Sequence, residues 1–280
     1  MGTGIPTVLE KRLLTGVPLA IGVLAIIAWA PSGVVSAVMA AAMLIAAWEW
    51  ADLAGLRGTA ARFVYVGGVA GLIALAALVA LPIQSVWQVP GLLWWLGVAV
   101  WLLDGARRPS PLALPVWLRA LAGVVTLTLA WVSVTAIHMR PGTGALWLTV
   151  LVVLVWGADI GGYFAGRRYG RRKLAPRISP GKTWEGVAGG LALALTAMLL
   201  LIAAAGGTRA GFPGYGWLLP VAVLVIALSV VGDLAESLLK RQAGRKDSGR
   251  LLPGHGGLLD RVDALLAAAP VLAGALAGVP

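Results

Sequence analysis

The sequence predicts an all-α integral membrane protein with about nine transmembrane helices. Of its 280 residues, 60% are hydrophobic and only 12% are charged, whereas a soluble domain carries roughly 25% charged residues. The mean hydropathy of the chain is +0.91. The apolar residues also fall into segments of about 17–25 residues, the length at which a helix crosses a bilayer. Because no alternating pattern of about ten residues accompanies them, helices rather than barrel strands are the expected spanning elements.

Nine segments meet this description, and we treat the chain as one membrane-embedded unit. They run over residues 13–30, 33–51, 63–82, 88–103, 117–138, 145–166, 185–205, 217–239 and 258–278. The first follows Lys11 and Arg12 without a small-residue cleavage site, so a retained helix is expected rather than a removed signal peptide. The fourth is short, and the ninth contains Pro270, which membrane helices tolerate as a kink. Residues 1–140 supply helices one to five, and residues 141–280 supply helices six to nine with the two long basic loops.

The distribution of basic residues predicts the orientation of these helices. Successive loops alternate between the two sides of the membrane. Of the 22 Lys and Arg residues, 20 lie in or beside the N-terminus and the loops of one side, and only Arg140 and Arg209 lie on the other side. The positive-inside rule then places the N-terminus in the cytoplasm and the C-terminus in the periplasm. These loops explain the net charge of +11, so nucleic acid is not an expected partner. The two long basic loops, residues 167–184 and 240–257, face the cytoplasm, where the functional site is expected.

Two aspartates are predicted to lie inside membrane-spanning helices. Asp159 comes eight residues before Arg167, and Asp233 comes seven before Lys240. At about 1.5 Å per residue, both therefore lie about 10–12 Å along a helix from the same side of the membrane. An ionised Asp at such a position costs about 2.5–3.5 kcal/mol and needs a partner or a watery cavity. The matching depths predict one shared polar cavity, and salt bridges to the abundant arginines are the alternative interpretation, above all for Asp159.

Asp260 and Asp263 add two carboxylates near the N-terminus of the ninth segment, where their i, i+3 spacing puts them on one helical face. Together with Asp233 they offer hard oxygen ligands, which favour Mg²⁺ over Zn²⁺. The sequence has no cysteine, which excludes thiolate metal sites and cysteine nucleophiles. The other acids beside the basic loops are expected to be solvated or locally paired; these are Glu10, Glu49, Asp52 and Asp104.

The loop between the eighth and ninth segments has the features of a phosphate-binding loop. Its glycines leave backbone N–H groups free to turn toward an anion, and the ninth helix begins nearby. These glycines are Gly249, Gly254, Gly256 and Gly257. Its cations can neutralise a polyphosphate; they are Lys240, Arg241, Arg245, Lys246 and Arg250. Carboxylates, cations and flexible glycines together are what phosphoryl or nucleotidyl transfer requires. Three roles stay open for His255: a general base, a hydrogen-bond donor to a phosphate, or a hydrogen-bond donor within the loop.

The last loop and the start of the ninth segment resemble the signature of the phosphatidate cytidylyltransferase (CDP-diacylglycerol synthase) family. The matching residues are Ser237, Lys240, Arg241, Lys246, Asp247, Pro253, Gly254, His255, Gly256, Gly257, Asp260, Arg261 and Asp263. Residues 158–186 are also similar to the family, at Asp159, Tyr163, Gly166, Gly170, Ser179, Pro180 and Lys182 to Gly186. Gly181 stands where a second lysine is expected. A P-loop is excluded there, because Pro176 stands where its first glycine would be.

The resemblance implies an enzyme that transfers a cytidylyl group from CTP to phosphatidic acid, giving CDP-diacylglycerol and pyrophosphate. It implies Mg²⁺ as cofactor, with a second, monovalent cation as an open addition. It further implies a homodimer in the bacterial inner membrane, with several crossings and an active site that faces the cytoplasm. The expected mechanism is direct, Mg²⁺-assisted attack of the lipid phosphate on the α-phosphorus of CTP.

The residue roles follow from the resemblance and the carboxylate pattern together. Mg²⁺ is expected at Asp233, Asp260 and Asp263, with Lys240 as a further catalytic residue. Lys240, Arg241 and Lys246 are expected to neutralise the polyphosphates and the pyrophosphate leaving group. The full set of expected substrate-binding residues is Asp159, Ser179, Lys182, Thr183, Ser237, Arg241, Lys246, Asp247, His255, Gly256, Gly257 and Arg261.

Two other functions stay open. A CTP-dependent polyprenol or phytol kinase would transfer the γ-phosphoryl group to a lipid alcohol and release CDP rather than pyrophosphate. A transporter or channel would need polar residues along a path through both leaflets, whereas the acids here cluster in the predicted cytoplasmic half.

Overall fold

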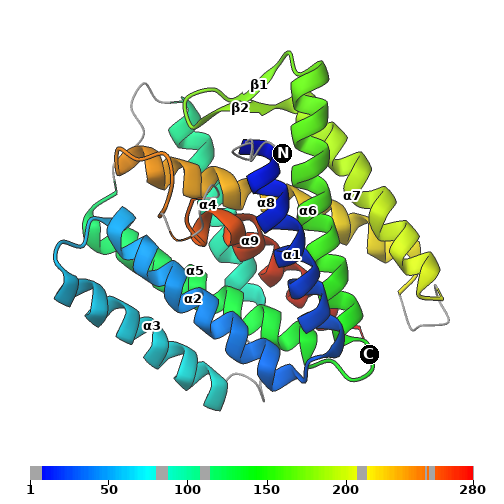
Figure 1. The fold of residues 1–280 in the computed structure, drawn as a ribbon, viewed down its shortest axis with the longest axis horizontal. Helices are drawn as coiled ribbons and strands as arrows, with labels where there is room; N and C mark the ends of the chain where they lie inside the picture. Colours follow the sequence, from blue (N-terminus) through cyan, green and yellow to red (C-terminus); the bar gives the residue numbers. More distant parts are fainter. Residues whose placement is uncertain are drawn as a thin grey trace, which may run out of the picture.

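The computed structural model describes residues 8–79, 88–107, 114–206, 213–249, 251 and 256–279. These residues form nine α-helices and one two-stranded hairpin (Figure 1). The helices are α1 (Val8–Trp29), α2 (Ser32–Ala54), α3 (Thr59–Val79), α4 (Gln88–Arg107), α5 (Val116–His138), α6 (Gly144–Tyr169), α7 (Trp184–Ala204), α8 (Tyr215–Gln242) and α9 (Leu259–Leu276). Each predicted apolar segment therefore corresponds to one helix.

Six of these helices are long and apolar enough to cross a membrane, namely α2, α3, α5, α6, α7 and α8. The apolar stretches of α1 and α4 are shorter, Gly16–Trp29 and Val89–Leu103. Helix α9 carries Asp260, Arg261 and Asp263 within its 18 residues. The class of a multi-pass helical membrane protein is confirmed, whereas nine crossings and the sides on which the termini lie stay predictions.

The predicted loop over residues 167–184 contains a hairpin, which is a departure from the expected all-α fold. Its two antiparallel strands are β1 (Lys173–Ala175) and β2 (Ser179–Thr183). Glu185, in the first turn of α7, accepts hydrogen bonds from the backbone N–H groups of Arg171 (3.0 Å) and Arg172 (3.2 Å). These bonds tie the start of the hairpin to the start of α7. Figure 1 shows the hairpin at the end of α6 from which α7 begins, extending to one side of this helix pair.

Side-chain hydrogen bonds show that α2 and α5 run antiparallel. Trp50, near the end of α2, donates to the carbonyl oxygen of Arg119 near the start of α5 (2.9 Å). Ser32, at the start of α2, donates to the carbonyl oxygen of His138 at the end of α5 (3.3 Å). The bundle therefore has one end that holds the α2–α3 connection and an opposite end that holds the α1–α2 connection.

The connections with most of the basic residues lie together at the first of these ends. The backbone N–H of Leu259, at the start of α9, donates to Glu49 near the end of α2 (2.8 Å). Arg241, at the end of α8, donates to the carbonyl oxygen of Ile178 in the hairpin (3.5 Å). At the opposite end, Arg140 donates to the carbonyl oxygens of Leu276, the last residue of α9, and of Val279, three residues after it. The α2–α3, α6–α7 and α8–α9 connections thus share one end, as the alternation of charge along the sequence predicts.

Helix α9 packs in the centre of the bundle, against α8, α5 and α4 (Figure 1). Its residues from Leu266 to Leu272 are buried. Many of its buried residues are alanines, and small side chains allow membrane helices to approach closely. The central position of α9 brings its first turn, with Asp260 and Asp263, between α8 and the hairpin end of α6.

Helices α6 and α7 pack through glycines. A Cβ added at Gly161 would lie 2.6 Å from the carbonyl oxygen of Gly189 and 2.9 Å from the Cα of Gly190. Such small-residue faces are typical of helix pairs in membranes. The close contact fixes the place of Asp159, which lies on α6, relative to the start of α7.

Gly161→Ala is therefore expected to lower the free energy of unfolding by about 1–3 kcal/mol, the usual cost of overpacking. Gly162→Ala is the matched control, because a Cβ there meets its nearest atom, the carbonyl oxygen of Gly186, at 3.6 Å, an ordinary contact. Thermal unfolding of the purified variants in detergent measures the difference. Equal Tm values for the two variants would contradict this account of the packing.

Candidate active site

A cavity of about 590 Å³ lies at the hairpin end of the bundle, between α6, β2, α7, α8 and α9. Its charged lining residues are Asp159, Arg167, Lys182, Asp233, Asp260, Arg261 and Asp263. Four carboxylates and three cations from distant parts of the sequence therefore face one space. The structure brings Asp159 and Asp233 into the same cavity, as their matching depths predict.

Asp233 links helix α8 to the hairpin. Its Oδ2 lies 2.5 Å from Nζ of Lys182, which is on β2, and its Oδ1 accepts a hydrogen bond from Ser237 one turn later (3.3 Å). The place of Lys182 is set by its neighbour Thr183, whose Oγ1 accepts from the N–H of Gly186 (3.1 Å) and caps α7. Ser237, which was expected to bind substrate, thus contacts and orients Asp233.

Lys240 lies behind the cavity, between two carboxylates. Its Nζ donates to Oε2 of Glu236 (2.5 Å) and to Oδ1 of Asp260 (2.6 Å). Glu236 is buried, with only 3% of its surface exposed. The predicted catalytic residue Lys240 therefore neutralises carboxylates of the protein itself and fixes α9 to α8.

Asp260 accepts two further hydrogen bonds from the glycine-rich turn. The N–H groups of Ser248 (3.0 Å) and Gly257 (2.8 Å) donate to its Oδ2. The turn depends on Gly256, whose φ of 81° lies in the region that favours glycine. The next two N–H groups, of Leu258 and Leu259, donate to Glu49. Among the loop glycines expected to turn N–H groups toward an anion, Gly257 thus donates to a carboxylate of the protein, and phosphate binding by the loop stays a prediction.

The remaining predicted residues fall into those at this cavity and those away from it. Ser179, Lys182, Thr183 and Arg261 line the cavity. Arg241 contacts the hairpin, and Gly256 and Gly257 lie behind Asp260. Lys246 and Asp247 line a different cavity, on the other side of the loop. His255 lies outside the described residues, together with Pro253 and Gly254.

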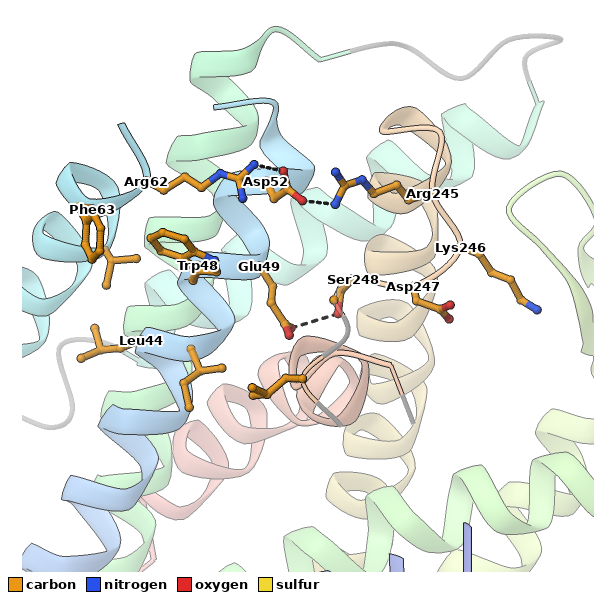
Figure 2. A pocket seen from close by; sticks show the side chains of 14 residues that line it. Leu44, Trp48, Glu49, Asp52, Arg62, Phe63, Arg245, Lys246, Asp247 and Ser248 are labelled. Atoms are coloured by element: carbon orange, nitrogen blue, oxygen red, sulfur yellow. Dashed lines mark hydrogen bonds and ion pairs between the residues drawn. The ribbon is translucent and has the colours of Figure 1, made fainter. Parts of the chain in front are cut away.

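The second cavity, of about 940 Å³, lies between α2, α3 and the segment after α8. Figure 2 shows Asp52 between Arg62 and Arg245, with an ion pair to each. Asp52 pairs with the nearby Arg62, as expected for a locally paired acid. Its second partner, Arg245, is distant in the sequence. Glu49, also expected to be solvated or locally paired, is buried and bonded to the α8–α9 loop and the start of α9.

Glu236 and Glu49 are thus two residues near the site that were not predicted as part of it. Glu236 had a signal in the sequence, because it lies three residues after Asp233 and four before Lys240 in the same apolar helix. The depth argument that selects Asp233 applies to it equally. Glu49 had no such signal, since its partners lie at least 199 residues further along the chain.

The acids of the first cavity fit Mg²⁺ in their chemistry. Asp159, Asp233 and Asp263 are hard oxygen donors that line the same space. In the part of the chain that the structure describes, no three acidic or histidine side chains are gathered closely enough to form a metal site as they stand. Binding would therefore draw these carboxylates closer together, and at Asp233 it would compete with Lys182.

The fold and the cavity together define a class of protein. This is a multi-pass helical membrane protein with an acid- and cation-lined cavity at one end of its helices. Cations and potential metal ligands in a cavity at the end of membrane-spanning helices suit a ligand that combines phosphate groups with a lipid.

Sequence comparisons identify the family. The profile of the cytidylyltransferase family matches residues 10–277, so the chain belongs to this family. The phosphatidate cytidylyltransferase of Pseudomonas aeruginosa is 40% identical over 257 residues, which cover 84% of this chain and 85% of the relative. The enzyme of the same name from Haemophilus influenzae is 46% identical over 149 residues (53% and 50%), and that from Brucella melitensis is 54% identical over 126 residues (45% and 44%). The predicted family and enzyme class are confirmed.

Proposed function

We propose that this chain transfers the cytidylyl group of CTP to phosphatidic acid, giving CDP-diacylglycerol and pyrophosphate. The observation that carries the proposal is the cavity of acids and cations at one end of the apolar helices of a cytidylyltransferase-family chain. The names of the relatives point to the same lipid substrate. A cavity in this position lets a lipid phosphate reach the charged residues while its acyl chains stay in the bilayer.

In the proposed reaction, an oxygen of the lipid phosphate attacks the α-phosphorus of CTP. A new O–P bond forms as the bond from the α-phosphorus to the bridging oxygen breaks, and pyrophosphate leaves with the bonding electrons. A phosphate monoester has a second pKa of about 6. The attacking oxygen is therefore ionised near neutral pH, and no side chain has to remove a proton or form a covalent intermediate.

The residues of the cavity have separate tasks in this proposal. Lys182 and Arg261 neutralise phosphate oxygens, and Asp233 keeps Lys182 in place. Mg²⁺ would be held by Asp233 and Asp263 with Asp260 as the third predicted ligand, and would supply positive charge to the phosphates. Lys240 keeps Asp260 beside α8.

The proposal includes the cellular setting. The basic connections at the cavity end favour the cytoplasmic face of a bacterial inner membrane. CTP then enters from the cytoplasm, and the lipid enters from the bilayer. The homodimer and the second, monovalent cation implied by the resemblance are part of the same proposal.

The reaction is tested with purified protein in vesicles that contain phosphatidic acid. We expect CTP to yield CDP-diacylglycerol in the lipid phase and an equal amount of pyrophosphate in water, both dependent on phosphatidic acid. Vesicles with a polyprenol in place of phosphatidic acid are the control. Release of CDP together with a phosphorylated alcohol would establish the lipid-kinase alternative and overturn the proposal.

A further inference from the structure

A single side chain of α2 reaches the loop that carries the active-site acids. Glu49, near the end of α2, is buried, with 6% of its surface exposed. Its carboxylate accepts hydrogen bonds from Oγ of Ser248 (3.1 Å) and from the backbone N–H groups of Leu258 (3.0 Å) and Leu259 (2.8 Å). Figure 2 shows Glu49 pointing from α2 toward Ser248. One carboxylate thus connects the N-terminal half of the chain to the start of α9.

Helix α9 depends on this contact for its N-terminal cap. The N-cap residue is Leu258, whose side chain makes no capping hydrogen bond. The first N–H groups of a helix have no acceptor within the helix, and a carboxylate placed there is also favoured by the helix dipole. Glu49 accepts from two of these N–H groups. A residue of α2 therefore caps α9 across the bundle.

Ser248 extends the connection to Asp260. Its Oγ donates to Glu49, and its backbone N–H donates to Oδ2 of Asp260 (3.0 Å). Asp260 in turn accepts from Lys240 (2.6 Å). Ser248 is only 1% exposed. A continuous series of hydrogen bonds thus runs from α2 through the loop to α9 and α8.

Two glycines of the loop allow the close approach of Glu49. A Cβ added at Gly257 would clash first with Oγ of Ser248 and would lie 2.5 Å from Oε2 of Glu49, and one added at Gly249 would lie 2.8 Å from Cδ of Glu49. Neither glycine has a positive φ, so the backbone conformation does not require glycine at these positions. Glycine is required because the Glu49 carboxylate and, at Gly257, also the Ser248 hydroxyl fill the space that a Cβ would take.

We propose that Glu49 is a positioning residue for the active site. Its carboxylate fixes the N-terminus of α9, and through Ser248 it fixes Asp260. This gives the N-terminal helices a defined part in catalysis. The effect on turnover rests on the proposed function, whereas the effect on the start of α9 does not.

The test replaces Glu49 by glutamine and compares this variant with His138→Gln. His138 is a matched control, because it is also buried and bonded, to Oγ of Ser32 (3.0 Å) and the carbonyl oxygen of Ile27 (3.0 Å), but at the opposite end of the bundle. In Glu49→Gln the amide N–H₂ meets donors in place of an acceptor. We expect kcat to fall about 100-fold, because misplacing reacting groups by about 1 Å can cost this much, while KM for CTP changes far less.

His138→Gln is expected to lower Tm and to leave the kcat of the folded protein unchanged. Amide hydrogen exchange over residues 257–263 should accelerate in Glu49→Gln and not in His138→Gln, whatever reaction the protein catalyses. Unchanged exchange in Glu49→Gln would overturn the inference. So would a loss of activity in both variants that only follows their loss of folded protein. An inactive wild-type protein would count against the proposed reaction alone.

A double-mutant cycle tests the contact itself. Gly249→Ala should lower kcat in the wild-type background, because its Cβ displaces the carboxylate of Glu49. In the Glu49→Ala background the same substitution should cost little, since the space is empty. Residues in contact show such non-additive effects, while independent sites add. Additive losses would overturn the assignment.

Discussion

Replacing Lys240 by methionine is expected to lower turnover about 100-fold, because Asp260 loses the cation that positions it and misplacing an active-site group by about 1 Å can cost this much, and to destabilise the fold. Nζ of Lys240 contacts the carboxylates of Glu236 (2.5 Å) and Asp260 (2.6 Å). The Glu236 side chain is 3% exposed and that of Asp260 is 10% exposed. Removing one partner of a buried ion pair costs about 3–5 kcal/mol, because the other charge stays buried without compensation. Tm and kcat of the purified variant measure the two effects.

A second substitution separates stability from catalysis. Glu236→Gln in the Lys240→Met background removes one of the two uncompensated charges. We expect this double variant to regain much of the lost Tm, while turnover stays low because Asp260 still lacks its cation. Recovery of turnover in step with Tm would show that Lys240 acts through folding alone.

Hydropathy was sufficient to predict the helices, because each apolar segment is a property of neighbouring residues. It did not predict the hairpin. The strands of the hairpin are short, and the bonds from Arg171 and Arg172 to Glu185 become visible only when the end of α6 and the start of α7 lie side by side. The central position of α9 was equally hidden, since an alanine-rich segment can face lipid or protein.

The site was predicted where isolated acids lie in apolar helices. Asp159 and Asp233 could be selected because a carboxylate in such a position needs a polar cavity. The partners of these acids depend on tertiary structure. Lys182 reaches Asp233 through the hairpin, and Glu49 reaches α9 from α2. Such contacts leave no periodic pattern along the chain.

The glycine-rich turn shows how a correct motif can receive an incomplete physical interpretation. Glycines before a helix are typical of phosphate sites. Here the N–H groups of Gly257, Leu258 and Leu259 donate to Asp260 and Glu49. The turn therefore orients Asp260, which faces the cavity, and Lys182 and Arg261, which also line it, are the groups that we propose to bind phosphates.

Asp263→Asn is expected to reduce turnover about 100-fold or more, comparable to losing an electrostatic group of an active site, with little change in Tm. Asp263 lines the cavity, and its Oδ1 accepts from the N–H of Ala264 (2.7 Å). The carbonyl oxygen of asparagine keeps this hydrogen bond but loses the charge that a metal ligand supplies. The Mg²⁺ concentration for half-maximal activity should therefore rise.

Asp260→Asn is the informative comparison, because the two acids have different surroundings. Asp260 accepts from Lys240, Ser248 and Gly257, so the amide N–H₂ of asparagine would face donors and Lys240 would lose its partner. We expect Asp260→Asn to lower Tm as well as turnover, unlike Asp263→Asn. A Mg²⁺ titration of both variants then separates the two roles of a carboxylate. A raised Mg²⁺ requirement with an unchanged Tm identifies a ligand, and a lowered Tm identifies a residue that holds α9 to α8. Near-normal rates for both variants at limiting Mg²⁺ would contradict the metal assignment, because neither carboxylate would then be needed to bind the ion.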